Sequence, residues 1–440
     1  IGRILKLGKC RYSSFAIVSL AAMLSKKGVD PAVFAKLGNI AVQLAGIYDY
    51  PEMINRVNYV YLTYLGVYSK SINTLPDELF RVHIQAYSAK DYDFAVLSLI
   101  SYFTTAFWFG TGLGILEQKI IYSLKDPNII SRKYFSGFIQ FHLWLVKSLQ
   151  HKSEAPGKYF GPSADTPEIL AGNLTRQGNK YFYFCYTLDM AFLNYLEGNY
   201  TNAYRFINKA DKETIAMMPG CISMIYKYLY SLISIAYCDG SRIKEKHRIL
   251  KTAHENCRDF WKISTESPNV FESKYYLIQA ELKRAQGGNF EAFDYYYKAV
   301  KSATAAGSMA DAALAAELAG RFLENSGKAD MAVFYYNIAL KNYSEWGAGK
   351  KHAQMEEKIN SFGKLSNFPV LVGSTVNLDD GSDVLSEERI DILAVTKSTQ
   401  AISGEIILER LLNLLIKTVM ENAGAEKVFL LLNKDRKSVV

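Results

Sequence analysis

Hydrophobic and polar positions follow a helical period along most of the chain, and part of this pattern is repeated. The stretches GGNFEAFDYYYKAV (Gly287–Val300) and GKADMAVFYYNIAL (Gly327–Leu340) align at a spacing of 40 residues. A third copy, EGNYTNAYRFINKA (Glu197–Ala210), and a weaker one, KDYDFAVLSL, place small residues at the same offsets. The repeated small positions are Ala203, Ala210, Ala292, Ala299, Ala332 and Ala339. Alanines seven residues apart lie on one helical face, so we expect them to contact an adjoining helix closely.

Each copy follows a second segment of helical period. Lys274–Gly287 precedes one copy and Met309–Gly327 precedes the next, and the intervening glycine favours a left-handed helix end. Near the N-terminus, Tyr12–Gly28 and Asp30–Gly46 form a similar pair. Each unit is therefore predicted to be a helix hairpin. Repeated helix hairpins are typical of tetratricopeptide solenoids, although the 40-residue spacing exceeds the usual ~34 residues.

The pattern changes near residue 362. No earlier segment shows the two-residue period of a β-strand, so residues 1–361 are predicted to be a mainly α, tetratricopeptide-like α-α superhelix (solenoid). Residues 362–385 mix Gly, Ser, Asp and Asn without a helical period and are predicted to be a linker. Residues 386–440 combine capped helices with the apolar stretch KVFLLL (Lys427–Leu432), which indicates the start of an incomplete α/β domain.

Composition narrows the possible partners and location. Most of the net charge of +8 lies within the first 36 residues, so no basic stripe runs through the chain and a nucleic-acid partner is not expected. The five cysteines form no C-x-x-C pair, which favours a reduced, cytoplasmic protein. The uncharged run Phe94–Leu116 is long enough to span a membrane, but its serines, threonines and glycines favour a buried helix instead.

No catalytic or metal-binding pattern emerges. The stretch GAGKKH (Gly347–His352) lacks the spacing and the hydroxyl residue of a phosphate-binding loop, so it is predicted to be a helix end and a basic helix start. His247, His254 and Cys257 lack a fourth metal ligand nearby. We therefore predict no catalytic, cofactor-binding or metal-binding residue and no enzyme activity in these 440 residues.

The chain is rich in aromatic residues, with 31 tyrosines and 24 phenylalanines. Aligned pairs such as Tyr295-Tyr296 and Tyr335-Tyr336 stand at helix-packing positions, which indicates buried rings whose hydroxyls remain in water. Some of these rings could instead line a peptide-binding groove. The sequence does not separate the two classes.

Three stretches resemble the central region of large bacterial hybrid sensor histidine kinases: Lys274–Val300, Ala315–Ala348 and, in particular, Ile392–Leu432. In that family a serine/threonine-kinase-like domain and an AAA-type ATPase precede a tetratricopeptide-like helical region, a GAF sensor domain and a histidine kinase. The segment from about Ala401 resembles the first helix and first strand of a GAF domain. The resemblance implies that the chain is a fragment of a longer reading frame.

The resemblance also implies a function. The chain would be a protein-interaction and signal-relay segment that links an upstream ATPase and kinase module to a GAF sensor and a histidine kinase. Its partners would be other proteins or neighbouring domains of the same polypeptide, with a dimer formed through the GAF and kinase part. ATP and Mg²⁺ are expected only for parent domains outside the chain. The alternative is an inducer- or partner-binding solenoid of an ATPase-type transcriptional regulator.

Overall fold

A computed structural model of the chain describes residues 10, 12–26, 29–47, 50–68, 72–151, 172, 180–210, 212–238, 243–266 and 270–363. The chain divides into two units, 1–370 and 371–440, and all described residues belong to the first. Apart from Phe362 and Gly363, the predicted linker (362–385) and the predicted GAF segment (386–440) lie outside the described residues.

Every element in the described ranges is helical, and no strand occurs among them, as the sequence predicts. The α-helices are α2 (Ser13–Leu24), α3 (Pro31–Ile47), α4 (Pro51–Val60), α5 (Leu75–Ser88), α6 (Tyr92–Trp108), α7 (Leu113–Ser123), α8 (Pro127–Ile130), α9 (Lys133–Leu149), α12 (Lys180–Leu196), α13 (Tyr200–Ile207), α14 (Lys212–Met217), α15 (Gly220–Cys238), α16 (Ile243–Glu266), α17 (Val270–Gln286), α18 (Asn289–Ala305), α19 (Met309–Asn325), α20 (Ala329–Trp346) and α21 (Gly349–Gly363). A π-helical turn (Tyr61–Leu65) and two 3-10 turns (Gly66–Tyr68 and Ile72–Thr74) join α4 to α5.

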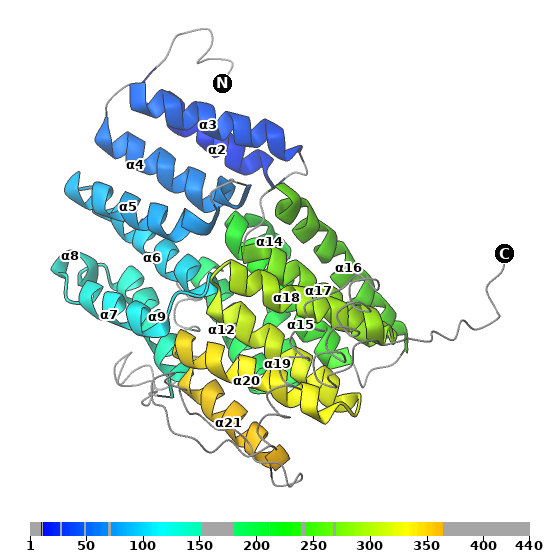
Figure 1. The fold of residues 1–440 in the computed structure, drawn as a ribbon. Helices are drawn as coiled ribbons and strands as arrows, with labels where there is room; N and C mark the ends of the chain where they lie inside the picture. Colours follow the sequence, from blue (N-terminus) through cyan, green and yellow to red (C-terminus); the bar gives the residue numbers. More distant parts are fainter. Residues whose placement is uncertain are drawn as a thin grey trace, which may run out of the picture. The chain divides into compact units, whose positions relative to one another are not determined.

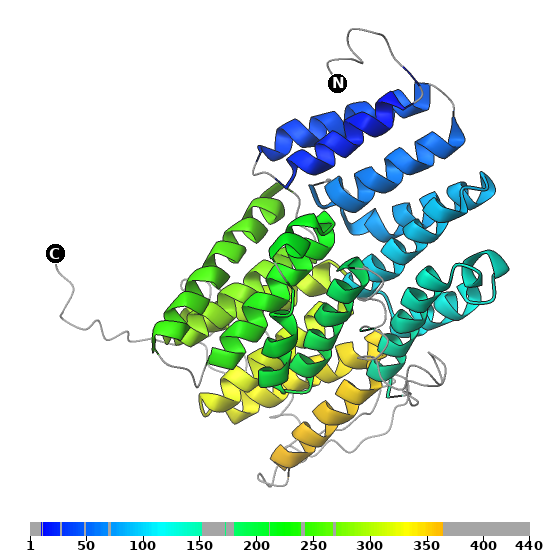
Figure 2. The same ribbon diagram turned by 180° about the vertical axis from the view of Figure 1, so that it is seen from behind.

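Consecutive helices pack in pairs, as expected for helix hairpins (Figures 1 and 2). The pairs are α2 with α3, α5 with α6, α12 with α13, α15 with α16, α17 with α18, and α19 with α20. The hairpins from α17 onward also stack on one another, because α18 packs on α19 and α20 packs on α21. The described helices therefore form a tetratricopeptide-like array.

The turns inside the repeated hairpins share one backbone geometry. The turn glycines have left-handed φ angles of 77° at Gly198, 84° at Gly287 and 74° at Gly327. In the weaker copy Lys90 occupies the equivalent place with φ 60°. The following N–H then reaches back to an orphan carbonyl of the first helix, as from Gly288 to Lys283 at 3.0 Å. Glycine suits this position because it has no Cβ to clash.

The third copy ends earlier than its sequence suggests. The helix α13 stops at Ile207, and Ala210 lies beyond it in a turn, where it is half-buried. The side-chain amide of Asn208, the residue after the helix, donates to the Tyr204 carbonyl at 2.8 Å and shares this acceptor with its own backbone N–H. The expected helical face ends before Ala210.

The uncharged run Phe94–Leu116 is mostly buried, although Gly114 and Ile115 are exposed, and it is split between two helices. Gly110, with φ 83°, belongs to the turn between α6 and α7. Almost all of α6 from Ala95 to Trp108 is buried, which agrees with the predicted buried helix. Among the described residues one helix, α15, is long and apolar enough to cross a bilayer, and 67% of its apolar window is buried within the protein. The α15 helix packs against α12, α13, α16 and α17.

The helices α20 and α21 contact helices from earlier in the chain, α6 and α9. The rings of Phe107 in α6 and Trp346 in α20 lie 6.0 Å apart. A Cβ on Gly349, at the start of α21, would lie 2.8 Å from the carbonyl oxygen of Gln150, so the two backbones are in close contact. This approach places α21 beside α9 and the end of α12, where the carbonyl of Leu196 meets a side chain of α21.

Candidate functional site

The repeated small residues occupy helix contacts. Ala203, Ala292, Ala299, Ala332 and Ala339 are each 0% exposed, whereas Ala210 is half-buried. The contact between α19 and α20 is especially close, because a Cβ on Gly320 would lie 2.6 Å from two ring carbons of Tyr336. These positions set the spacing of the array.

The aligned tyrosines Tyr296 and Tyr336 were expected to keep their hydroxyls in water, but both hydroxyls bind carboxylates instead. Tyr296 is fully buried, and its hydroxyl donates to the carboxylate of Glu281 in α17 rather than to water. Arg284 donates to the same carboxylate at 2.8 and 3.0 Å. The tyrosine therefore fastens α18 to α17 through a buried acid.

The next repeat reverses these charges. Arg321 stands 40 residues after Glu281, and Glu324 stands 40 residues after Arg284. The hydroxyl of Tyr336 accordingly donates to Glu324, at 2.6 Å. Each tyrosine keeps a carboxylate partner. In the second repeat, however, a cation, Arg321, stands at the position that the acid Glu281 occupies in the first.

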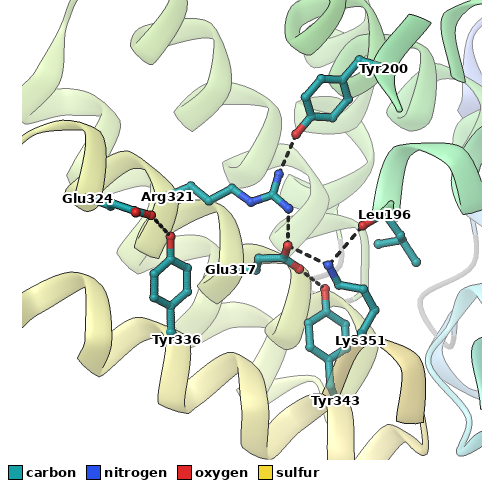
Figure 3. A network of polar contacts seen from close by, with 8 residues as sticks. All are labelled: Leu196, Tyr200, Glu317, Arg321, Glu324, Tyr336, Tyr343 and Lys351. Carbon is teal, nitrogen blue, oxygen red and sulfur yellow. Dashed lines mark hydrogen bonds and ion pairs between the residues drawn. The ribbon is translucent and has the colours of Figure 1, made fainter. Parts of the chain in front are cut away.

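Glu317 of α19 is the centre of a polar network, shown in Figure 3. Its carboxylate, 1% exposed, accepts hydrogen bonds from Tyr343 at 2.6 Å and Lys351 at 2.7 Å, and it also pairs with Arg321. Arg321 donates to the hydroxyl of Tyr200 at 2.5 Å. The network thus links α19 to α20, α21 and α13.

Lys351 connects this network to α12. Its ammonium, on a residue 3% exposed, also donates to the carbonyl of Leu196 at 3.1 Å. That carbonyl lies at the last residue of α12, where the helix leaves its final carbonyls without internal partners. We name the contacts of Glu317 with Lys351, and of Lys351 with Leu196, the α21 joint.

The electrostatics of the α21 joint favour a charged carboxylate. Burial alone would raise the pKa of Glu317, but the charges of Lys351 and Arg321 and the hydrogen bonds from Lys351 and Tyr343 outweigh it. The pKa of Glu317 is therefore lowered from its ordinary value. A buried charge held in this way is costly to leave unpaired.

Two surface pockets flank the α21 joint. One of about 450 Å³ is lined by Arg321, Glu324, Tyr336, Lys351 and Lys358 among others. The other, of about 440 Å³, extends along α9 and α12. Both pockets are lined by Leu196, Glu197, Lys351 and Gln354. Both pockets mix charged and apolar side chains and reach the surface next to the buried ion pair.

The sequence missed the role of Lys351. The GAGKKH stretch is a helix end followed by a basic helix start, as predicted, since Gly347 follows α20 with φ 90° and Gly349 begins α21. Lys351, however, is buried in an ion pair instead of facing solvent. One indication was present, because Glu317 is an isolated acid in the apolar stretch AALAAELAG.

The histidine and cysteine group is not brought together. His247 and His254 are exposed on α16, whereas Cys257 is buried on another side of that helix. Within the described ranges no cluster of three or more His, Cys, Asp or Glu residues is arranged to hold a metal ion.

Comparisons with known proteins support the repeat architecture. No curated protein matches the chain. Residues 173–330 match the family model described as CHK1-like, TPR repeats, a segment that runs from before α12 to the start of α20. Tetratricopeptide repeats suggest a role in protein interaction. The chain therefore contains a tetratricopeptide-like repeat region, and the α21 joint closes its C-terminal end.

Proposed function

We propose that the chain is a protein-interaction and signal-relay segment of a multidomain sensor kinase. The observation that carries this proposal is the stack of helix hairpins whose residues 173–330 match a tetratricopeptide family model. Such arrays bind partners through extended surfaces, and each hairpin contacts mainly its neighbours.

The α21 joint supports the relay part of the proposal. Glu317 and Lys351 fasten the last described helix to α19, and Leu196 connects it to the middle of the array. A partner that shifts the α12–α13 turn or α19 therefore acts directly on α21. A buried ion pair favours discrete arrangements over gradual deformation, as a relay requires.

The kinase context rests on the resemblance of Ile392–Leu432 to the start of a GAF domain, since that segment lies outside the described residues. In this proposal a serine/threonine-kinase-like and AAA-type ATPase module acts upstream, and a GAF sensor and histidine kinase act downstream. The chain itself is non-catalytic and needs no cofactor. It works in the cytoplasm, with protein partners or domains of the same polypeptide, and it dimerises through the GAF and kinase part.

The interaction role is tested by affinity capture with the purified 440-residue chain. The wild type and Ala299→Trp, which overpacks the contact between helices, are incubated with extract of cells that encode the chain. The proposal expects a reproducible protein partner that the wild type retains and the variant loses. Equal recovery by both proteins, or recovery of nucleic acid alone, contradicts an interaction role for the array.

The non-catalytic role is tested separately by nucleotide binding. We expect no ATP affinity in the purified chain, because GAGKKH lacks the geometry of a phosphate-binding loop. Micromolar, magnesium-dependent binding of ATP in equilibrium dialysis contradicts this part of the proposal.

The flanking pockets favour one second candidate, an inducer-binding solenoid of an ATPase-type transcriptional regulator. Arg321, Lys351 and Lys358 offer cations next to apolar walls, and the volume of about 450 Å³ suits a small metabolite. Gln354→Trp would fill the space that both pockets share. If a metabolite from a library raises the melting temperature of the wild type but not of Gln354→Trp, this candidate replaces the relay proposal.

A further inference from the structure

One side of α16 is buried and the opposite side is exposed. Ile249, Ala253, Cys257 and Phe260 face the core. The exposed residues are His247, Arg248, Lys251, His254, Glu255, Arg258, Trp261 and Lys262. At about 100° per residue these eight positions form one continuous arc, with Lys251 and Arg258 near its centre. We name this set the α16 face.

Positive charge predominates on the α16 face. Arg248, Lys251 and Arg258 form no ion pair among the described residues, in contrast to Asp259 at the flank, which pairs with Lys227 at 2.5 Å. Glu255 is the single carboxylate in the arc. From Arg248 to Lys262 the row extends for about 20 Å along the helix. Its potential therefore attracts a partner of opposite charge.

An aromatic side chain lies near the end of the row. Trp261 is 50% exposed, and its ring centroid lies 5.2 Å from that of Tyr275 in α17. The contact orders the indole, and half of the residue's surface remains exposed. Tryptophan and arginine are the side chains most enriched at the energetic centres of protein interfaces.

We propose that the α16 face docks an acidic amphipathic segment of a protein partner. Carboxylates of the partner pair with Arg248, Lys251 and Arg258, and an apolar side chain packs on Trp261. This inference rests on the proposed interaction function and specifies the chemistry of the partner. A protein can place a donor opposite Glu255, whereas the uniform phosphates of a nucleic acid would be repelled there.

The test measures binding of a fluorescein-labelled peptide of repeated Glu-Glu-Leu-Ala, about 16 residues long so that as a helix it spans the row. The full chain is compared with Arg248→Glu/Lys251→Glu/Arg258→Glu. A matched control, Lys125→Glu/Lys301→Glu/Lys328→Glu, makes the same change of net charge at exposed lysines away from α16. Melting temperatures identify any variant that fails to fold.

We expect the triple variant on α16 to weaken peptide binding by at least about tenfold and the control by no more than about twofold. A peptide with lysine in place of glutamate should bind the α16 variant better than the wild type. Equal weakening by both triple variants, or no peptide binding by the wild type, overturns the proposal. Tighter binding of a single-stranded oligonucleotide of equal charge also overturns it.

The α16 variant separates this inference from the proposed function. If the partner captured by the wild-type array binds the α16 variant equally well, the docking surface is wrong and the interaction function stands. If Ala299→Trp does not reduce capture, the interaction function itself fails.

Discussion

Lys351 places its ammonium 2.7 Å from the carboxylate of Glu317, although 34 residues separate them in the chain. Both side chains are almost fully buried, and Lys351 also binds the Leu196 carbonyl, 155 residues away. The ion pair therefore closes the C-terminal end of the array onto its middle.

Removal of one charge from the α21 joint should be strongly destabilising. Glu317→Gln leaves the buried cation of Lys351, and that of the partly exposed Arg321, without their counter-charge, which should lower the free energy of unfolding by about 3–5 kcal/mol. Lys350→Met is the control, because the ion pair of Lys350 with Glu197 is on the surface and should contribute only about 0–1 kcal/mol. Urea denaturation compares the two variants, and similar losses would argue against a buried joint.

The same carboxylate predicts a pH dependence. The pKa of Glu317 is lowered in the folded state. The ion pair therefore stabilises the protein above the unfolded pKa of about 4.3, and this stabilisation is lost as the pH falls through the folded pKa. The stability difference between wild type and Glu317→Gln, measured by urea denaturation, should shrink in acid. A difference that stays constant with pH would contradict the assignment.

The helical pattern identified most elements but not the joint. The hairpins from Lys274 onward follow from hydrophobic period and turn glycines, both of which are local properties of the sequence. The contact between Lys351 and Glu317 is not local, because periodicity shows which face of a helix is buried and not which helix covers it. Ala210 shows the opposite failure, since the repeated spacing placed it on a helix but α13 ends at Ile207, before that position.

Replacing a glycine inside a helix by alanine usually stabilises the protein, but the close contact at Gly320 should reverse this effect. An added Cβ would lie 2.6 Å from ring carbons of Tyr336, so Gly320→Ala should destabilise the protein by about 1–3 kcal/mol. Gly137→Ala in α9 is the matched control, because its Cβ would have nothing within 4 Å. That change should stabilise by up to about 1 kcal/mol through helix propensity. Thermal denaturation shows whether the two alanines act in opposite directions.

The hydroxyls of the aligned tyrosines should contribute unequally. Tyr296→Phe leaves the buried Glu281 short of a donor and should cost about 1–3 kcal/mol. Tyr336→Phe should cost less, about 0.5–1.5 kcal/mol, because the side chain of Glu324 is 31% exposed and can bind water. Urea denaturation of the two variants tests this order, and a larger loss from Tyr336→Phe would contradict it.

The turn before α6 offers a stabilising change. Lys90 adopts φ 60°, the left-handed conformation that the other copies give to glycine. Lys90→Gly should relieve this strain and raise stability by about 1 kcal/mol. The reverse change, Gly198→Lys, should lower it by a similar amount, because φ at Gly198 is 77°. If Lys90→Gly and Gly198→Lys change the melting temperature in the same direction, the turns at Lys90 and Gly198 are not equivalent.

Hydrogen exchange tests whether the α21 joint couples the last described helix to the array. Amide exchange is followed in α21, at Met355 and Ile359, and in the distant helix α3, for the wild type and Glu317→Gln. We expect α21 to be well protected in the wild type, and we expect Glu317→Gln to accelerate its exchange far more than that of α3. Unchanged exchange in α21, or equal acceleration in both helices, would show that the joint does not hold α21 in place.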